Sequence, residues 1–298
     1  MHPRNPIDVA AERSGEPVFR EVGVGPWAQT HPGEPRPDDP ASPAFDARYD
    51  TRLLDEGDRR NVLDRYRYWS VPAIKADLDR RGRHDFEVAV ENWTHDFNIG
   101  SMVRTANAFQ ARRVHIVGPH KWNRKGALMT ELYQHVEHHP SIAELVACWR
   151  YRIAGEIAAA RSEARAVNDR MYAGVRGVIQ EGVTSGRPAD EAHREASALS
   201  DEGFARIAAI EARIRELEAA RIIAMDIIPG AVPMETYDFP KRCLLLFGAE
   251  GPGLSDKALE LADDVVYISQ FGSVRSINAG AAAAVAMHSW IARHAVAR

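Results

Sequence analysis

The chain has 298 residues, of which 45% are hydrophobic and 27% charged, and its formal net charge is −4 at pH 7. A chain of this length can bury an ample core in one large domain or in two small ones. It has no apolar run near the ~20 residues of a membrane-spanning helix, and its first residues lack the apolar core of a signal peptide. Two cysteines cannot supply a disulfide framework, so we expect a cytoplasmic protein with no membrane partner.

The first part of the chain is acidic and shows no apolar periodicity. Residues 1–58 contain twelve Asp and Glu against six Arg, so the remaining chain carries a small positive net charge. Residues 1–50 are rich in Pro, Gly, Asp and Arg, a composition that buries too little apolar surface to offset the entropy of ordering. We therefore expect residues 1–50 to form a flexible N-terminal tail, with a local docking segment around Val18 to Trp27.

Residues 51–83 combine basic and aromatic side chains, and we expect a helical extension there. The basic residues are Arg52, Arg59, Arg60, Arg65, Arg67, Lys75, Arg80, Arg81 and Arg83, and the aromatic ones are Tyr66, Tyr68 and Trp69. One interpretation is contact with nucleic acid, because basic residues bind phosphates and aromatic rings stack on bases. The other is a solvated pair of helices whose aromatic rings pack on the core, and the interspersed acidic residues favour it.

A strand, a helix and a second strand are predicted next. Residues 86–91 alternate as a strand, Asn98 or Ser101 can cap a helix that runs to about Phe109, and residues 114–117 form the following strand. This β-α-β pattern predicts a parallel sheet.

Several potential metal ligands follow closely along the chain. They are His135, His138, His139 and Cys148. Their spacing fits no standard four-ligand zinc site, and the chain has no second pair of cysteines. We therefore expect these histidines on a helical surface and no metal site.

Two long helices are predicted between residues 141 and 219. Ser141 and Glu144 have the spacing of a capping box, and apolar residues then recur at intervals of three and four. A second helix with the same periodicity begins near Ser200, after a turn region at 182–188. The pattern predicts an antiparallel helical hairpin at 151–219, either an arm that contacts RNA or a partner, or a structural extension.

The last part of the chain alternates strands with polar loops. A strand is predicted at 221–228, another at 243–247 before a glycine-rich turn, and a third at 265–269 before a polar loop and an alanine-rich helix. Glycines after a strand allow a ligand to approach the backbone closely. The turn at 248–255 matches neither a dinucleotide-binding fingerprint nor a phosphate-binding P-loop, so we do not expect a nucleotide-dependent oxidoreductase.

Three segments resemble, in the right order, the motifs of the SpoU/TrmH branch of the SPOUT superfamily of RNA ribose methyltransferases. The first runs from Asn92 to Phe109 and contains Asn98, Gly100 and Arg104, the second is 246–255, and the third runs from Ile268 to Asn278. The resemblance covers about residues 84–150 and 220–296. It excludes the N-terminal tail and the helical segment.

The resemblance implies an α/β fold with a mostly parallel sheet and a C-terminal trefoil knot, interrupted by an inserted α-helical hairpin. The methyltransferase domain then comprises 84–150 and 220–298, and the insertion comprises 151–219. The resemblance also implies a homodimer.

The resemblance further implies an S-adenosylmethionine-dependent enzyme that methylates a ribose 2′-hydroxyl in tRNA or rRNA. The cofactor would be bound by Met225, Phe247, Gly248, Gly253, Ile268 and Ile277. The catalytic positions would be Arg104, Asn98, Glu250, Ser276 and Asn278. The alternative is a non-catalytic RNA-binding or scaffolding protein that retains the fold.

The sequence departs from the family pattern at positions that carry none of the proposed functional groups. Gln110 stands where the family often has Gly, Ile277 replaces the more frequent Leu, and Ala279-Gly280 replaces a common Val-Ser. These departures affect the expected identity of the substrate more than the expected activity.

Overall fold

The structure is a computed structural model, and it describes residues 5–16, 22–93, 98–274 and 276–295. It divides into two compact units, Met1–Arg80 and Arg81–Arg298. Among the described residues, no helix is long and apolar enough to cross a membrane.

The first unit contains short helices joined by long loops. They are α1 (Pro6–Ser14), α2 (Trp27–Thr30), α3 (Thr51–Glu56), a 3-10 turn at Asp64–Tyr66, and α4 (Val71–Arg80). Residues 22–50 are not separate from those that follow, because bridges pair Val24 with Asp58 and Tyr49 with Trp69. The predicted boundary at residue 50 therefore does not coincide with a boundary of this unit.

A buried carboxylate and packed aromatic rings stabilise the fold of this first unit. Asp58 is fully buried and accepts hydrogen bonds from the Tyr68 backbone N–H at 3.0 Å and from the Arg60 Nη2 at 2.7 Å. Tyr66, Tyr68 and Trp69 are at most 8% exposed. These rings pack inside the unit, which favours the packing interpretation over stacking on bases.

The second unit is built on a seven-stranded sheet in which every strand pair is parallel, as the β-α-β pattern predicted. The strand order is β3-β2-β1-β6-β4-β7-β5. The strands are β1 (Phe86–Glu91), β2 (Val114–Val117), β3 (Val136–His139), β4 (Arg221–Met225), β5 (Val232–Pro233), β6 (Cys243–Phe247) and β7 (Asp264–Tyr267).

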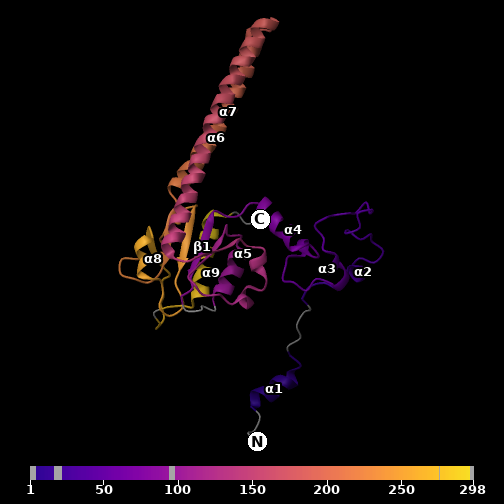
Figure 1. Ribbon diagram of the computed structural model, residues 1–298, viewed down its shortest axis with the longest axis vertical. Coiled ribbons are helices and arrows are strands. Elements are labelled where there is room, and N and C mark those ends of the chain that lie inside the picture. Colours follow the sequence, from indigo (N-terminus) through magenta and orange to yellow (C-terminus); the bar gives the residue numbers. More distant parts are fainter. Residues whose placement is uncertain (1–4, 17–21, 94–97, 275, 296–298) are drawn as a thin grey trace. The chain divides into compact units, whose positions relative to one another are not determined.

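Helices cover both faces of this sheet (Figure 1). They are α5 (Ile99–Ala108), α6 (Ile142–Ser185), α7 (Ala189–Glu218), α8 (Asp256–Leu261) and α9 (Ala279–His294), with 3-10 turns at Arg124–Ala127 and Thr130–Leu132. Alternate strand residues point to opposite faces. Leu245 and Phe247 pack with α5 and α9, whereas Leu244 and Leu246 pack with α6 and α8. The central strand is therefore apolar at every position.

Helices α6 and α7 lie side by side, as Figure 1 shows. Ser141 caps α6 by accepting the Glu144 N–H, as the capping box predicted, and Gly186 ends it in the left-handed conformation. The first turns of α6 pack on the sheet, and farther along Ala160 and Val167 pack against Ile210 of α7. Helix α6 starts at Ile142, directly after the predicted cap, whereas α7 starts at Ala189, earlier than the start near Ser200 that the sequence predicted.

Two local expectations differ from the structure. His138 and His139 lie on the edge strand β3 and not on a helical surface, because β2 pairs with this short segment. Gln110 follows α5 with φ of 53°, in the left-handed region that favours glycine. A glycine at this position would adopt the same φ without strain.

The two cysteines differ sharply in accessibility. Cys148 is exposed and Cys243 is buried in β6, where burial raises the pKa of the Cys243 thiol well above its usual range. Since the thiolate is the reactive form, we expect a thiol reagent to modify one cysteine in the folded protein and two after denaturation. Titration with a chromogenic disulfide checks this count. Rapid modification of both cysteines in the folded chain would contradict the burial of Cys243.

Candidate functional site

A cavity of about 260 Å³ lies where the segments after β4, β6 and β7 come together. Ligands of α/β proteins bind at this carboxyl edge of the sheet. Its lining residues are Met225, Asp226, Ile227, Phe247, Gly248, Ala249, Glu250, Gly251, Gly253, Val266, Tyr267, Ile268, Gln270, Ser276, Ile277, Asn278, Ala279 and Ala282. All six residues predicted to bind the cofactor are among them, as are three of the five predicted catalytic residues.

The glycine-rich turn after β6 folds back on itself very tightly. A Cβ atom on Gly248 would lie 2.0 Å from the carbonyl carbon of Gly253, which no real side chain tolerates. Gly253 itself has φ of 76°, and its N–H donates to the Ala249 carbonyl at 3.0 Å. The Asp226 carboxylate accepts the next N–H, that of Leu254, at 3.1 Å. The turn therefore presents bare backbone to the cavity and requires glycine at both positions.

Three side chains from distant segments meet at the rim of the cavity. Asn98 precedes α5, Glu250 lies in the glycine-rich turn, and Asn278 caps α9. The Asn98 amide donates to the Glu250 carboxylate, and the Asn278 amide donates to the Asn98 oxygen at 2.9 Å and to Glu250 at 3.3 Å. The side chain of Asn98 therefore joins loops and does not cap its own helix, although the sequence offered it as a cap.

The side chain of Asn278 makes two separate sets of hydrogen bonds. Its side-chain oxygen caps α9 by accepting the Ala281 N–H at 3.1 Å, while its amide group reaches Asn98 and Glu250. Asn278→Ala removes both, so we expect it to lower the free energy of unfolding by about 1–2 kcal/mol. Denaturant unfolding of Asn278→Ser is the matched control, because serine restores the cap but cannot reach the other two side chains. Equal stability of the alanine and serine variants would show that the cap contributes nothing.

Arg104 does not line the cavity. It lies on α5, six residues after Asn98, with its side chain exposed, and it makes no hydrogen bond or ion pair with any residue that the structure describes. An exposed guanidinium with no internal partner is available for an anionic or hydroxyl-bearing ligand. Ser276 and Ile277 are likewise exposed at the rim, whereas Arg275 and 94–97 lie outside the described residues.

Nine of the eighteen lining residues were not predicted from the sequence, and two of these nine, Asp226 and Gln270, carry a carboxylate and an amide. Asp226 directly follows β4, and a polar residue at the carboxyl end of a parallel strand was the signal that could have found it. Gln270 follows β7, and its side-chain oxygen is buried without a hydrogen-bond partner among the described residues. An unpartnered buried oxygen facing a cavity favours a ligand with an N–H or O–H donor.

The residues that line the cavity indicate which class of ligand it can bind. Met225, Phe247 and Ile268 give it apolar walls, while Asp226 and Glu250 supply carboxylates. No Lys or Arg lines it among the described residues, so it suits a ligand with hydroxyl, amine or cationic groups better than a pyrophosphate. An apolar cavity with a few polar groups and exposed backbone is the pattern of a small-molecule site.

Part of the chain matches the model of a known protein family. Residues 171–288 match the model of the SpoU rRNA Methylase family, which confirms the resemblance to the SpoU/TrmH branch inferred from the motifs. The second and third motifs lie inside the matched segment, and the first motif lies outside it.

Among curated proteins, the chain is similar to two tRNA (guanosine(18)-2′-O)-methyltransferases. The Saccharomyces cerevisiae protein is 32% identical over 81 residues, which cover 27% of this chain and 6% of that one. The Thermus thermophilus protein is 48% identical over 48 residues, which cover 16% of this chain and 25% of that one. The chain thus spans at most a quarter of the length of these relatives.

The chain is also similar to solved structures, at lower sequence identity than to these curated proteins. The SpoU methyltransferase AviRb from Streptomyces viridochromogenes in complex with AdoMet is 21% identical, with a TM-score of 0.44 over 72% of this chain and 60% of that one. The A. aeolicus TrmH/SpoU tRNA modifying enzyme is 14% identical, with a TM-score of 0.45 over 73% of this chain and 82% of that one.

Proposed function

We propose that this protein transfers a methyl group from S-adenosylmethionine to a ribose 2′-hydroxyl of tRNA or rRNA. The observation that carries the proposal is the convergence of the three motifs. The second and third motifs line one cavity, and the first is tied to its rim by the hydrogen bonds of Asn98 to Glu250 and Asn278. The family match and the names of the two curated relatives support the same reaction.

The residues of the cavity fit the cofactor. The apolar walls at Met225, Phe247 and Ile268 suit an adenine ring, and the backbone at Gly248 and Gly253 allows close approach. The carboxylate of Asp226 and the buried oxygen of Gln270 are acceptors for hydroxyl and amino groups. When bound, S-adenosylmethionine supplies an activated methyl group on a sulfonium.

The protein's own task is then to position the ribose. With the methyl donor bound, the transfer would require the ribose 2′-hydroxyl to be held facing the cavity and its proton to pass to water. We assign Arg104 to hold the 2′-hydroxyl or an adjacent phosphate, because guanidinium stays protonated and binds oxygen acceptors. Glu250, Ser276 and Asn278 would keep the loops around the cavity in register.

Several finer features belong to the same proposal. The strand order places β6 between β1 and β4, and we propose that the C-terminal segment forms the trefoil knot of the family. We propose that 84–150 and 220–298 form the methyltransferase domain, that the α6–α7 hairpin over 151–219 is its insertion, and that the protein acts in the cytoplasm as a homodimer. The non-catalytic alternative is an RNA-binding protein with the same fold.

Methyl transfer separates the two hypotheses. Wild-type protein is incubated with labelled S-adenosylmethionine and total cellular RNA, and cofactor binding is measured in parallel by calorimetry. Label in RNA is expected for the enzyme. Cofactor binding and RNA binding without label in any RNA fraction would favour the non-catalytic alternative.

A further inference from the structure

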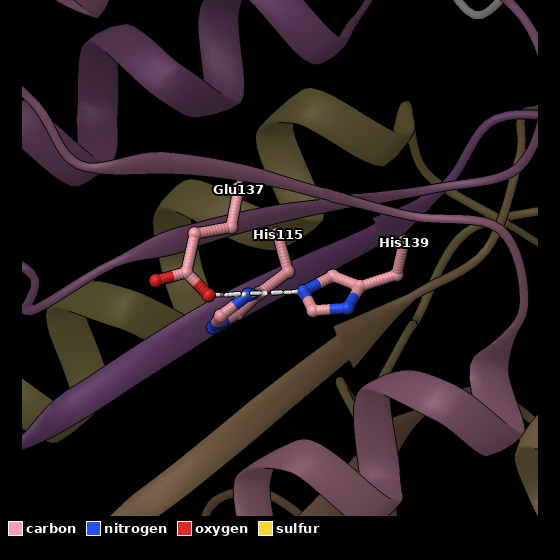
Figure 2. Close-up of side chains that lie close together, drawn as sticks. All are labelled: His115, Glu137 and His139. Atoms are coloured by element: carbon pink, nitrogen blue, oxygen red, sulfur yellow. Dashed lines mark hydrogen bonds and ion pairs between the residues drawn. The ribbon is translucent and has the colours of Figure 1, made fainter.

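A cluster of titratable side chains lies on β2 and β3, and none of its members lines the cavity (Figure 2). His115 is fully buried, and its Nδ1 lies 3.0 Å from Nε2 of His139. The Oε2 of Glu137 lies 3.5 Å from His115 Nδ1 and 3.8 Å from His139 Nε2. Two imidazole nitrogens and a carboxylate oxygen therefore form a small triangle.

The sheet itself brings these atoms together. In the parallel register of β2 and β3, His115 pairs with Glu137 and Val117 pairs with His139. Residues two apart on a strand point to the same face, so Glu137 and His139 both face the side chain of His115. The metal ligands considered from the sequence were His135, His138, His139 and Cys148, and His115, which lies on the neighbouring strand β2, was not among them.

The triangle has the dimensions of a tetrahedral site with three of its four ligands in place. Zinc lies about 2.0–2.1 Å from nitrogen and carboxylate oxygen ligands, so neighbouring ligand atoms in a tetrahedron are about 3.3–3.4 Å apart. The three observed separations, 3.0, 3.5 and 3.8 Å, lie around this value. One further position would remain for water or another ligand.

Neighbouring residues orient the three candidate ligands. Glu87 is buried and its Oε2 lies 2.7 Å from His115 Nε2. Because an ionised carboxylate only accepts, this contact places the proton on His115 Nε2 and leaves the lone pair of Nδ1 facing the triangle. Histidine ligands of metals usually donate their second N–H to a carboxylate in this way. The Glu137 carboxylate is fixed by Arg113 Nε at 2.7 Å and by Arg152 Nη1 at 2.8 Å.

The surrounding charges restrict which ion would bind. Glu87 and Glu137 are balanced by the guanidinium groups of Arg113, Arg152 and Arg242. A hard cation that depends on an excess of carboxylates is therefore disfavoured. Imidazole donors select zinc and similar divalent transition metals, whose bonds to nitrogen are more covalent.

We propose that His115, Glu137 and His139 bind one divalent transition-metal ion of the zinc class, with Glu87 as a positioning residue for His115. The ion would tie the edge strand β3 to β2. This site is independent of the methyl-transfer reaction. The competing account is a hydrogen-bond network without metal, in which His139 Nε2–H donates to His115 Nδ1.

The test uses the full chain without a histidine tag, freed of metal by a chelator. Titration with Zn²⁺ is expected to give one bound ion per chain, and Co²⁺ is expected to give the visible absorption of a tetrahedral site. Zinc at about a hundred times its Kd is expected to raise Tm by about 5 °C. His139→Ala should abolish all three effects, while His138→Ala, an exposed neighbour on the same strand, should leave them unchanged.

Three results would overturn the proposal. The first is wild-type protein that binds neither Zn²⁺ nor Co²⁺, a measurement that does not depend on any variant folding. The second is binding that persists in both His139→Ala and His115→Asn. The third is a sulfur-to-cobalt charge-transfer band that Cys148→Ser removes, because the ion would then occupy the neighbouring group of His139, Glu144 and Cys148.

Discussion

Replacing Arg104 with alanine is expected to lower the rate of methyl transfer to RNA by about 10²–10⁴-fold while leaving cofactor affinity within about twofold of wild type. The reason is geometric. Arg104 is exposed on α5 and does not line the cavity, so its loss removes no contact of the cofactor. Single-turnover methyl transfer with enzyme in excess measures the first quantity, and calorimetric titration with S-adenosylmethionine measures the second.

The control for this experiment is Arg104→Lys. Lysine retains the positive charge but presents a single point donor in place of the planar fork of guanidinium. We therefore expect partial recovery of RNA binding without recovery of the transfer rate. Since Arg104 makes no hydrogen bond or ion pair with the described residues, both variants should unfold at the wild-type midpoint. An Arg104→Ala protein with the wild-type rate would remove Arg104 from the mechanism.

The second large effect is expected at Gly248. A methyl group there would lie 2.0 Å from the carbonyl carbon and 2.2 Å from the carbonyl oxygen of Gly253, and both atoms belong to the backbone. The glycine-rich turn must open to accommodate it, so we expect Gly248→Ala to weaken cofactor binding by at least about 100-fold. Overpacking of this kind also costs about 1–3 kcal/mol of stability. Calorimetric titration and denaturant unfolding measure the two effects.

Gly272→Ala is the matched control for Gly248→Ala. Gly272 lies in the next loop of the same site, and a Cβ atom there would have no neighbour within 4 Å. We expect this variant to bind the cofactor and to unfold like wild type. If the two alanine variants behave alike, the tight closure of the turn has no role in cofactor binding.

The C-terminal half was predictable because its signals are local. A run of five apolar residues followed by glycines specified β6 and its turn, and the structure places β6 at Cys243–Phe247 as predicted. The family resemblance placed six residues at one cofactor site, and all of them line the cavity: Met225, Phe247, Gly248, Gly253, Ile268 and Ile277. Their roles in binding remain a prediction.

Features that depend on distant partners were not predictable. Residues 1–50 were predicted to be a flexible tail with a local docking segment around Val18 to Trp27. The structure also holds the far end of this tail, because Tyr49 bridges Trp69, a contact that local periodicity does not reveal. His139 was assigned to a helix because nothing in four residues of an edge strand shows that it pairs with β2. The same limitation hid the approach of His115 to His139, which only the strand register brings about.

The most direct test of the account is the position of the transferred methyl group. RNA labelled by the wild-type protein is hydrolysed completely with alkali, and the fragments are separated by size. A methyl group on the 2′-oxygen blocks attack of that oxygen on the adjacent phosphate, so the account predicts label in alkali-resistant dinucleotides. Label recovered only in mononucleotides would place the methyl group on a base and contradict ribose methylation.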